Sequence, residues 1–272
     1  MEFSDDTVSL KPVVRTFYDN VAPVNDLDFH PKATLLISCS QDNSIKFFDH
    51  EKMIQKKAYN EIVERKNIRS IQFHPSGEYI ISAGDNRFIR IINVQNFKTF
   101  ISRDSLKQHK HPINQVRYNE DGKTYVSCSK DGQIKFWDGL NNICYRTIEN
   151  AHGGAPVSSI HFSQNSKLLL SCGPDSTARI WDVGTGQEWL KIQGFRNDSY
   201  RSNAVFFHSD AFVLCPDKTS NSIFAFDKNT GKKVRQFLGH SKPVKCLSVS
   251  QSEPAFLSCS FDHRARFWGE EF

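Results

Sequence analysis

The sequence has no apolar run long enough to cross a lipid bilayer, and segments with helical periodicity are scarce. Its first residues, Met1 to Asp6, are not a signal peptide. These absences argue against a helical membrane protein and predict a soluble one. Hydrophobic residues nevertheless make up 38% of the 272 residues, including 22 phenylalanines, which is enough for a sizeable core.

The motifs of common cofactor sites are also missing. No glycine-rich phosphate loop follows a strand and opens a helix, and no cysteine pair has the spacing of a zinc site. His109 and His111 could supply two metal ligands, but a repeated pattern described below assigns His109 to another role. We therefore expect no cofactor and no metal.

Blocks of charge of one sign are absent as well. The 35 Lys and Arg residues exceed the 30 Asp and Glu residues by five, and they are spread along the chain. A net charge of +5 permits an acidic partner without identifying one. Basic and aromatic residues alternate between Arg196 and Arg201, where an exposed loop is favoured over a contact with RNA.

What the sequence does contain is a repeat. The stretch from Ser127 to Asp138 alternates like a strand, turns at Lys130-Asp131-Gly132, and alternates again toward Trp137. Related stretches close at residues 49, 93, 138, 182, 227 and 269, so the period is 42 to 45 residues. A period of this length, with several strands and an aromatic-Asp ending, is typical of the WD40 β-propeller.

We therefore predict an all-β fold, a WD40 β-propeller with six visible repeats, which means six blades, or seven with one missing. Residues 1–11 are expected to form a flexible leader and residues 12–269 the propeller, because no linker separates the repeats. A propeller closes when one blade combines strands from both chain ends. We expect a strand at Val13 to Phe17 to pair with the last strand, Ala265 to Trp268.

Five of the seven cysteines are assigned to one repeat position. They are Cys39, Cys128, Cys172, Cys215 and Cys259. Equivalent positions on different blades are held apart, whereas a disulfide needs Cα atoms within about 7 Å. We expect buried free thiols in a reducing compartment.

Three repeats carry His, Ser, Asp and Trp at nearly constant spacing. His and Asp are 22 or 23 residues apart, and Asp and Trp are always six apart. A hydrolase triad needs one such set at one cleft, so three copies indicate a structural relay in which imidazole joins Asp to Ser and the indole N–H bonds the hydroxyl. The sets are His109, Ser127, Asp131 and Trp137; His152, Ser171, Asp175 and Trp181; and His240, Ser258, Asp262 and Trp268. We expect no catalytic residue and no enzyme activity.

The other repeats replace parts of this set. The places fall on Asn20, Ser38, Asp42 and Phe48 in the first repeat, on Glu64, Ser82, Asn86 and Ile92 in the second, and on Asp198, Pro216, Ser220 and Phe226 in the fifth. The fifth repeat is thus expected to lack both the His and the turn Asp. We expect the second and fifth blades to be the least rigid.

Propellers bind partners mostly on the rim where the turns with the relay Asp meet the loops entering the inner strands. Phe261 is the clearest candidate, because a large apolar side chain at a turn tip has little structural reason to be exposed. The expected protein-binding residues are Gln41, Arg69, Lys130, Arg201, Lys245, Phe261 and Arg264. The alternative is that they are ordinary solvated side chains.

Several stretches resemble one family more closely than the general repeat does. The most specific are Leu214-Cys215-Pro216-Asp217 and the closing Arg264-Ala265-Arg266-Phe267-Trp268; Pro12 to Asp19, Arg69 to Gly77 and Ser127 to Gly132 add to them. From residue 12 to residue 268 the chain is similar to the WD-repeat region of the family of the 50-kilodalton subunit of cleavage stimulation factor.

This resemblance implies a non-enzymatic nuclear scaffold in mRNA 3′-end cleavage and polyadenylation. Its implied partners are the other cleavage stimulation factor subunits, RNA polymerase II, and pre-mRNA indirectly through the complex, with no membrane. Members of that family carry seven WD repeats and a helical self-association segment, whereas six repeats and no such segment are visible here. A generic WD40 adaptor that binds a peptide in another nuclear complex is the alternative.

Overall fold

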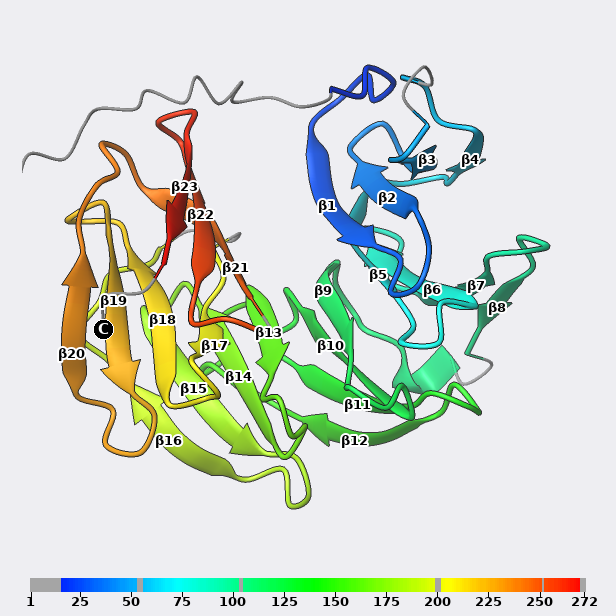
Figure 1. Cartoon of the computed structure of the whole chain (residues 1–272). Coiled ribbons are helices and arrows are strands. Elements are labelled where there is room, and N and C mark those ends of the chain that lie inside the picture. Colours follow the sequence, from blue (N-terminus) through cyan, green and yellow to red (C-terminus); the bar gives the residue numbers. More distant parts are fainter. Residues whose placement is uncertain (1–15, 53–55, 103–104, 199–201, 251, 270–272) are drawn as a thin grey trace, which may run out of the picture.

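The structure, a computed structural model, describes residues 16–52, 56–102, 105–198, 202–250 and 252–269. In these residues the strands form six antiparallel sheets in chain order, five with four strands and the last with three (Figure 1). The predicted all-β WD40 propeller with six blades is therefore confirmed. The described residues contain no helix long and apolar enough to cross a membrane.

The strands of the first three blades are as follows. Blade 1 contains β1 (Val24–Phe29), β2 (Leu35–Ser40), β3 (Ser44–Asp49) and β4 (Asn60–Val63). Blade 2 contains β5 (Ile68–Phe73), β6 (Tyr79–Gly84), β7 (Ile89–Asn93) and β8 (Thr99–Ile101), and the short 3-10 helix η1 (Ser105–Lys107) follows it. Blade 3 contains β9 (Ile113–Tyr118), β10 (Thr124–Ser129), β11 (Ile134–Asp138) and β12 (Cys144–Ile148).

The strands of the other three blades continue the series. Blade 4 contains β13 (Ser159–Phe162), β14 (Leu168–Gly173), β15 (Thr177–Asp182) and β16 (Glu188–Ile192). Blade 5 contains β17 (Val205–Phe207), β18 (Phe212–Asp217), β19 (Ser222–Asp227) and β20 (Lys233–Phe237). Blade 6 contains β21 (Val244–Val249), β22 (Phe256–Ser260) and β23 (Ala265–Trp268).

The core lies between neighbouring blades. Strand residues alternate between the two faces of each sheet, so that one set points to the preceding blade and the other to the following blade. Between blades 3 and 4, for example, Val126, Cys128 and Phe136 pack against Leu169 and Trp181. Apolar clusters of the same kind fill the other seams between consecutive blades. Each repeat therefore needs its neighbours to bury its two faces.

Side chains of the inner strands bond each blade to the next. A side-chain acceptor on one inner strand receives a backbone N–H from the following inner strand, 44 to 46 residues later. The acceptor and donor residues are Asp26 and Ile71, Asp28 and Phe73, Ser70 and Val116, Gln72 and Tyr118, Gln115 and Ile160, Ser159 and Ala204, His161 and Phe206, and Asn203 and Leu247.

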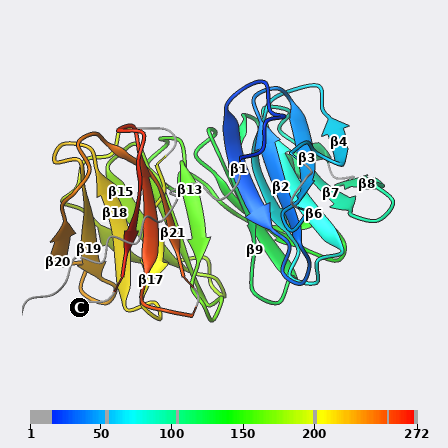
Figure 2. The ribbon, with the colours of Figure 1, turned by 45° about the horizontal axis from the view of Figure 1, so that its top comes forward.

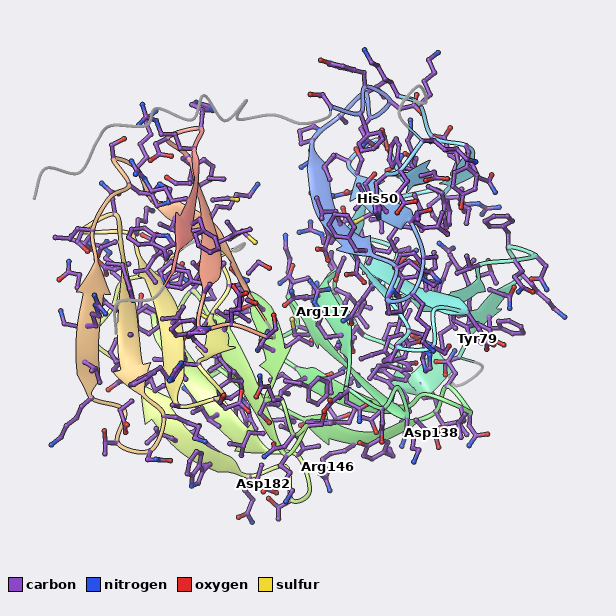
Figure 3. The ribbon with its side chains drawn as sticks, viewed as in Figure 1. His50, Tyr79, Arg117, Asp138, Arg146 and Asp182 are labelled. Carbon is purple, nitrogen blue, oxygen red and sulfur yellow. The ribbon has the colours of Figure 1, made fainter. Side chains whose placement is uncertain are left out.

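A longer contact joins the inner strands of three consecutive blades. Arg117 of β9 reaches past blade 2 and donates to Asp26 of β1 at 3.0 Å and to Ser70 at 2.8 Å (Figure 3). Burial raises the pKa of the neighbouring Asp28 to about 6. The inner strands of blades 1 to 3 thus form a connected polar network.

In the described residues no strand of blade 6 pairs with a strand of blade 1, and the ribbons of the two blades stand apart (Figures 1 and 2). Within the part of the chain that the structure describes, β23 pairs only with β22. On the face of blade 6 that does not pack against blade 5, the side chains of Leu257 and Phe267 are 47% and 68% exposed. Residues 13–15 of the predicted closing strand, and the predicted leader 1–11, lie outside the described residues. Phe17 lies in no strand and packs against Phe48 of β3, with ring centroids 4.8 Å apart. The predicted pairing with β23 is therefore wrong for Phe17, because the blade 1 aromatic offers it an apolar contact instead.

Candidate functional site

In three blades the predicted relay residues are hydrogen-bonded to one another. In blade 3, His109 Nδ1 lies 2.8 Å from Asp131, its Nε2 lies 2.8 Å from Ser127 Oγ, and the Trp137 indole donates to the same hydroxyl at 2.9 Å. Blades 4 and 6 repeat the arrangement, with each of these distances between 2.7 and 2.9 Å. The residues there are His152, Ser171, Asp175 and Trp181 in blade 4, and His240, Ser258, Asp262 and Trp268 in blade 6.

The charges fix the direction of these bonds in blade 3. Burial lowers the pKa of His109 and outweighs the opposite effect of Asp131, so the imidazole is neutral at pH 7. Burial raises the pKa of Asp131, but hydrogen bonds from His109 and from backbone N–H groups lower it below its usual value. His109 Nδ1–H therefore donates to the carboxylate, Nε2 accepts from Ser127, and Ser127 accepts from Trp137. Because Ser127 is 0% exposed, no substrate can reach its hydroxyl, and we interpret the relay as structural.

Blades 1 and 2 use other polar pairs at these places. In blade 1, Asn20 Nδ2 donates to Ser38 Oγ at 3.2 Å, so an amide stands where other blades have imidazole. In blade 2, Glu64 forms an ion pair with Arg90 of β7. No group of three or more His, Cys, Asp or Glu side chains in the described part of the chain could hold a metal ion.

Blade 5 departs from the sequence-based alignment by one residue. Six residues separate the paired Pro216 and Ile223, where five separate the paired Cys172 and Ala178 of blade 4. Cys215 therefore faces blade 4, at the place of a relay Ser, and packs near Cys172. Its assignment to the common cysteine position is wrong, and Pro216 occupies that position instead.

The turn carboxylate of blade 5 comes from the strand itself. Asp217, at the end of β18, accepts the backbone N–H of Arg196 at 2.7 Å and of Ser220 at 2.8 Å, and the Ser220 hydroxyl at 2.6 Å. Asp131 accepts the equivalent backbone bonds from Lys110 and Gln133 in blade 3. The prediction that blade 5 lacks a turn Asp is thus wrong, because the longer turn moves the carboxylate back along the chain.

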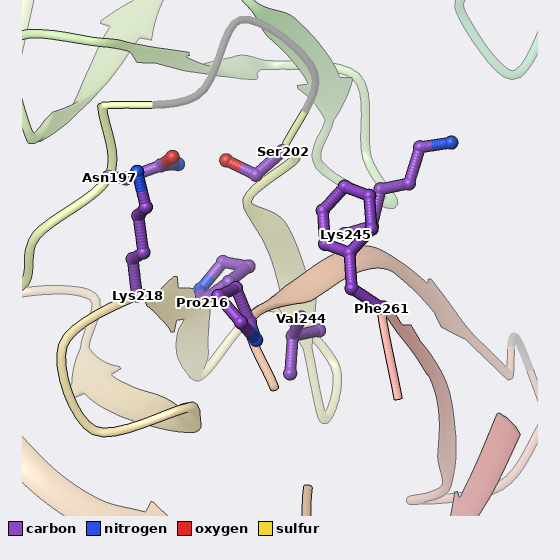
Figure 4. Close-up of a pocket in the computed structure, with 8 residues that line it drawn as sticks. Asn197, Ser202, Pro216, Lys218, Val244, Lys245 and Phe261 are labelled. Carbon is purple, nitrogen blue, oxygen red and sulfur yellow. The ribbon is translucent and has the colours of Figure 1, made fainter. Parts of the chain in front are cut away.

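A pocket of 330 Å³ lies between blades 5 and 6 on the predicted binding rim (Figure 4). Pro216 and Val244 supply its apolar wall, and the half-exposed Phe261 stands beside them. Lys218, Lys245 and Ser202 add polar groups. The pocket therefore joins an apolar surface to a positive one.

The polar groups of this pocket differ in how they are satisfied. Lys218 is bonded to the Asp198 carboxylate at 2.5 Å. Lys245 Nζ lies 6.0 Å from the centroid of the Phe261 ring and forms no ion pair with any described residue. Ser202 is only 3% exposed, and its hydroxyl has no hydrogen-bond partner among the residues that the structure describes. A positive charge and a buried hydroxyl are thus both uncompensated here.

Of the predicted rim residues that the structure describes, Lys245 and Phe261 line this pocket. Arg264 is exposed on the turn of Phe261 but does not line the pocket, and Gln41 is exposed at another turn. Lys130 is half-buried, and Arg201 lies outside the described residues. The guanidinium of Arg69 bonds Asp85 at 2.5 Å with 14% of its side chain exposed, so its charge is already neutralised. The sequence did not predict the pocket residues Ser202, Pro216, Lys218 and Val244. The unusual Leu214 to Asp217 stretch and the missing relay His indicated only that blade 5 differs.

The family model described as WD domain, G-beta repeat, matches residues 11–49, 61–93, 101–138, 142–182 and 231–269. The chain belongs to the WD40 family. The stretch between the last two matches, 183–230, contains β18 and β19 of blade 5, where the register is shifted and the relay His is absent.

Individual relatives agree with the resemblance found in the sequence. The chain is 38% identical over 262 residues to cleavage stimulation factor subunit 50 of Arabidopsis thaliana, covering 96% of this WD40 chain and 61% of that protein. It is 31% identical over 261 residues to periodic tryptophan protein 2 of Saccharomyces cerevisiae, covering 93% and 26%. It is 24% identical over 282 residues to striatin-3 of Rattus norvegicus, covering 95% and 35%. The chain thus spans less than two thirds of each of these relatives.

Proposed function

We propose that this WD40 chain is a non-enzymatic scaffold subunit of a cleavage stimulation factor that acts in mRNA 3′-end cleavage and polyadenylation in the nucleus. The observation that carries this proposal is the 38% identity, over 96% of the chain, to cleavage stimulation factor subunit 50. Its partners are then the other subunits of that factor and RNA polymerase II. Pre-mRNA is reached indirectly through the complex, and no membrane is involved.

The burial of the relay supports a scaffold rather than an enzyme. All three relay serines, Ser127, Ser171 and Ser258, are fully buried and accept an indole N–H. Each imidazole is held between a carboxylate and a hydroxyl on the same blade. Groups held in this way rigidify blades and present rim turns at fixed positions.

The rim supports protein binding because it exposes large or charged side chains at turn tips. Phe261 is 52% exposed, and Arg264 is exposed on the same turn. Turn-tip residues contribute little to the core, whereas a desolvated aromatic at an interface can contribute about 2 kcal/mol or more. We therefore assign the partner contacts to this rim.

The test is affinity purification of the tagged chain from nuclear extract, followed by identification of the bound proteins. We expect wild type to recover 3′-processing factors. A triple variant with Lys130→Glu, Arg264→Glu and Phe261→Ala should lose them while its thermal transition stays within a few degrees of wild type.

A matched triple variant provides the control. Lys32→Glu and Lys167→Glu reverse exposed charges at turns on the opposite rim, and Phe100→Ala removes an exposed aromatic ring of β8. This variant should recover the same factors as wild type. Undiminished recovery by the first triple variant would remove the rim turns from consideration, and failure of wild type to recover any 3′-processing factor would reject the proposed function.

A further inference from the structure

We propose that Cys246 of β21 and Cys259 of β22 form a reversible disulfide by exchange with a small-molecule disulfide such as glutathione disulfide. Both side chains are free thiols in this structure. The site is independent of the proposed scaffold function, because it follows from the strand register, exposure and thiol chemistry of blade 6.

The strand register brings the two thiols together. Cys246 and Cys259 are direct partners in the antiparallel pairing of β21 with β22. Residues directly opposite each other in such a pair share one face of the sheet, with Cα atoms about 4.5–5.5 Å apart. A disulfide needs Cα atoms about 4.4–6.8 Å apart, so the backbone of blade 6 allows the bond.

Among the described strand pairs, only blade 6 has cysteine at both of these positions. In blades 1, 3 and 4 the partner of the middle-strand cysteine is Asp26, Gln115 or Ser159. Each of these partners accepts a backbone N–H from the inner strand of the following blade. In blade 6 the place of this polar acceptor is taken by the thiol of Cys246.

The two thiols lie on an uncovered face of the molecule. The middle-strand cysteines of blades 1, 3 and 4 are 0% exposed, because the following blade packs against them. Cys246 and Cys259 are both exposed, on the side of the last described blade that faces away from blade 5 (Figure 1). The predicted burial of Cys259 is therefore wrong, and a small molecule can reach the pair.

The exchange takes two steps. The thiolate of one cysteine attacks a sulfur of glutathione disulfide, so that the S–S bond breaks, one glutathione leaves and a mixed disulfide forms. The thiolate of the other cysteine then attacks the protein sulfur of this mixed disulfide and releases the second glutathione. The two protein thiols are oxidised to a disulfide, and glutathione disulfide is reduced to two glutathione thiols that carry the two protons.

Proximity, rather than the reactivity of either thiol, favours the bond. Neighbouring groups displace water from both sulfurs and raise their pKa values, that of Cys246 to about 11, so few thiolates exist at pH 7 and the first step is slow. Cys246 Sγ makes only a weak contact, 3.8 Å from the carbonyl oxygen of Leu247, so it can turn toward Cys259. Because the second step is intramolecular, the mixed disulfide should not accumulate.

The test is incubation of the reduced full chain with glutathione disulfide at about pH 8, followed by alkylation with N-ethylmaleimide and mass spectrometry. Trypsin cuts after Lys245 and Arg264, so both cysteines fall in one peptide, 246–264. We expect this peptide to lose two hydrogens, to escape alkylation, and to become alkylated at both cysteines after treatment with dithiothreitol. Wild type should contain about tenfold less mixed disulfide than Cys246→Ser or Cys259→Ser, in which the second step is impossible.

The matched control is Cys128→Ser, because Cys128 has the same strand position in blade 3 but is buried. This variant should form the disulfide of blade 6 as wild type does. Wild type that stops at the mixed disulfide, or that stays unmodified, would overturn the proposal. Oxidation of Cys128 at the same rate as the blade 6 pair would also overturn it, since the reaction would then proceed through unfolding.

Discussion

Removing the relay carboxylate of blade 3 by Asp131→Ala tests the structural interpretation most directly. The carboxylate accepts the imidazole N–H of His109 at 2.8 Å and the backbone N–H groups of Lys110 and Gln133 at 3.0 Å. Alanine leaves the imidazole donor buried without a partner, at a cost of about 1–3 kcal/mol. Loss of the two turn bonds adds about 0.5–1.5 kcal/mol, since Lys110 is exposed and Gln133 is only half-buried.

We therefore expect Asp131→Ala to lower the free energy of unfolding by about 1.5–4.5 kcal/mol, measured by urea titration. Asp121→Ala is the matched control, because Asp121 also accepts a backbone N–H in a turn, that of Lys123, but is exposed and bonds no imidazole. The control should cost less than about 1 kcal/mol. Equal destabilisation by the two substitutions would refute the reasoning.

Three other predictions follow from single contacts. The pKa of Asp28 is raised to about 6, so the protein loses stability as the pH rises from about 4 to above 6 and this carboxyl ionises. Asp28→Asn should reduce the loss of unfolding free energy between pH 4.5 and pH 7.5, measured by urea titration, by about 2 kcal/mol, and an unchanged pH profile would contradict this. Gly122 and Gly194 both have a positive φ, +73° and +100°, but an added Cβ would meet the His74 ring at Gly122 and nothing within 4 Å at Gly194. Gly122→Ala should therefore lower the melting temperature several degrees more than Gly194→Ala, and equal shifts would count against the contact with His74. The isolated chain has a net charge of only +5, so we expect it to bind RNA weakly in filter binding, with an affinity that falls steeply between 50 and 200 mM salt. Tight, salt-insensitive binding would instead indicate that the chain itself recognises RNA.

The period and the relay could be predicted from the sequence because they rest on local, repeated spacing. Asp131 and Trp137 belong to one hairpin, so their separation of six residues fixes their geometry wherever it recurs. The hydrogen bonds to His109 then follow from its constant distance along the chain.

Blade 5 could not be read in the same way because one extra turn residue changes which face a side chain takes. Counting backward from Phe226 places Ser220 at the turn carboxylate position. In the structure Asp217 instead accepts the backbone N–H bonds of the turn, as the strand register requires. The pocket depends on this difference and on Ser202, whose burial has no signal in the sequence. Closure of the ring is a long-range property, and the contact of Phe17 with Phe48 is no more visible in the local pattern.

The bonds between inner strands have a direction, because the acceptor side chain belongs to the earlier blade and the donor is backbone of the later one. The backbone donor is available whatever residue the later blade carries, so the side chains of one blade determine how firmly it holds its successor. Exchanging the inner strand of blade 3 for one that keeps Arg117, whose guanidinium bonds Ser70 and Asp26, should therefore disturb its attachment to blade 4 more than its attachment to blade 2. Gln115 is lost toward blade 4, whereas Ser70 and Gln72 of blade 2 are unchanged. Repeats joined in this way can diverge or be replaced one at a time, with each replacement weakening mainly a single seam.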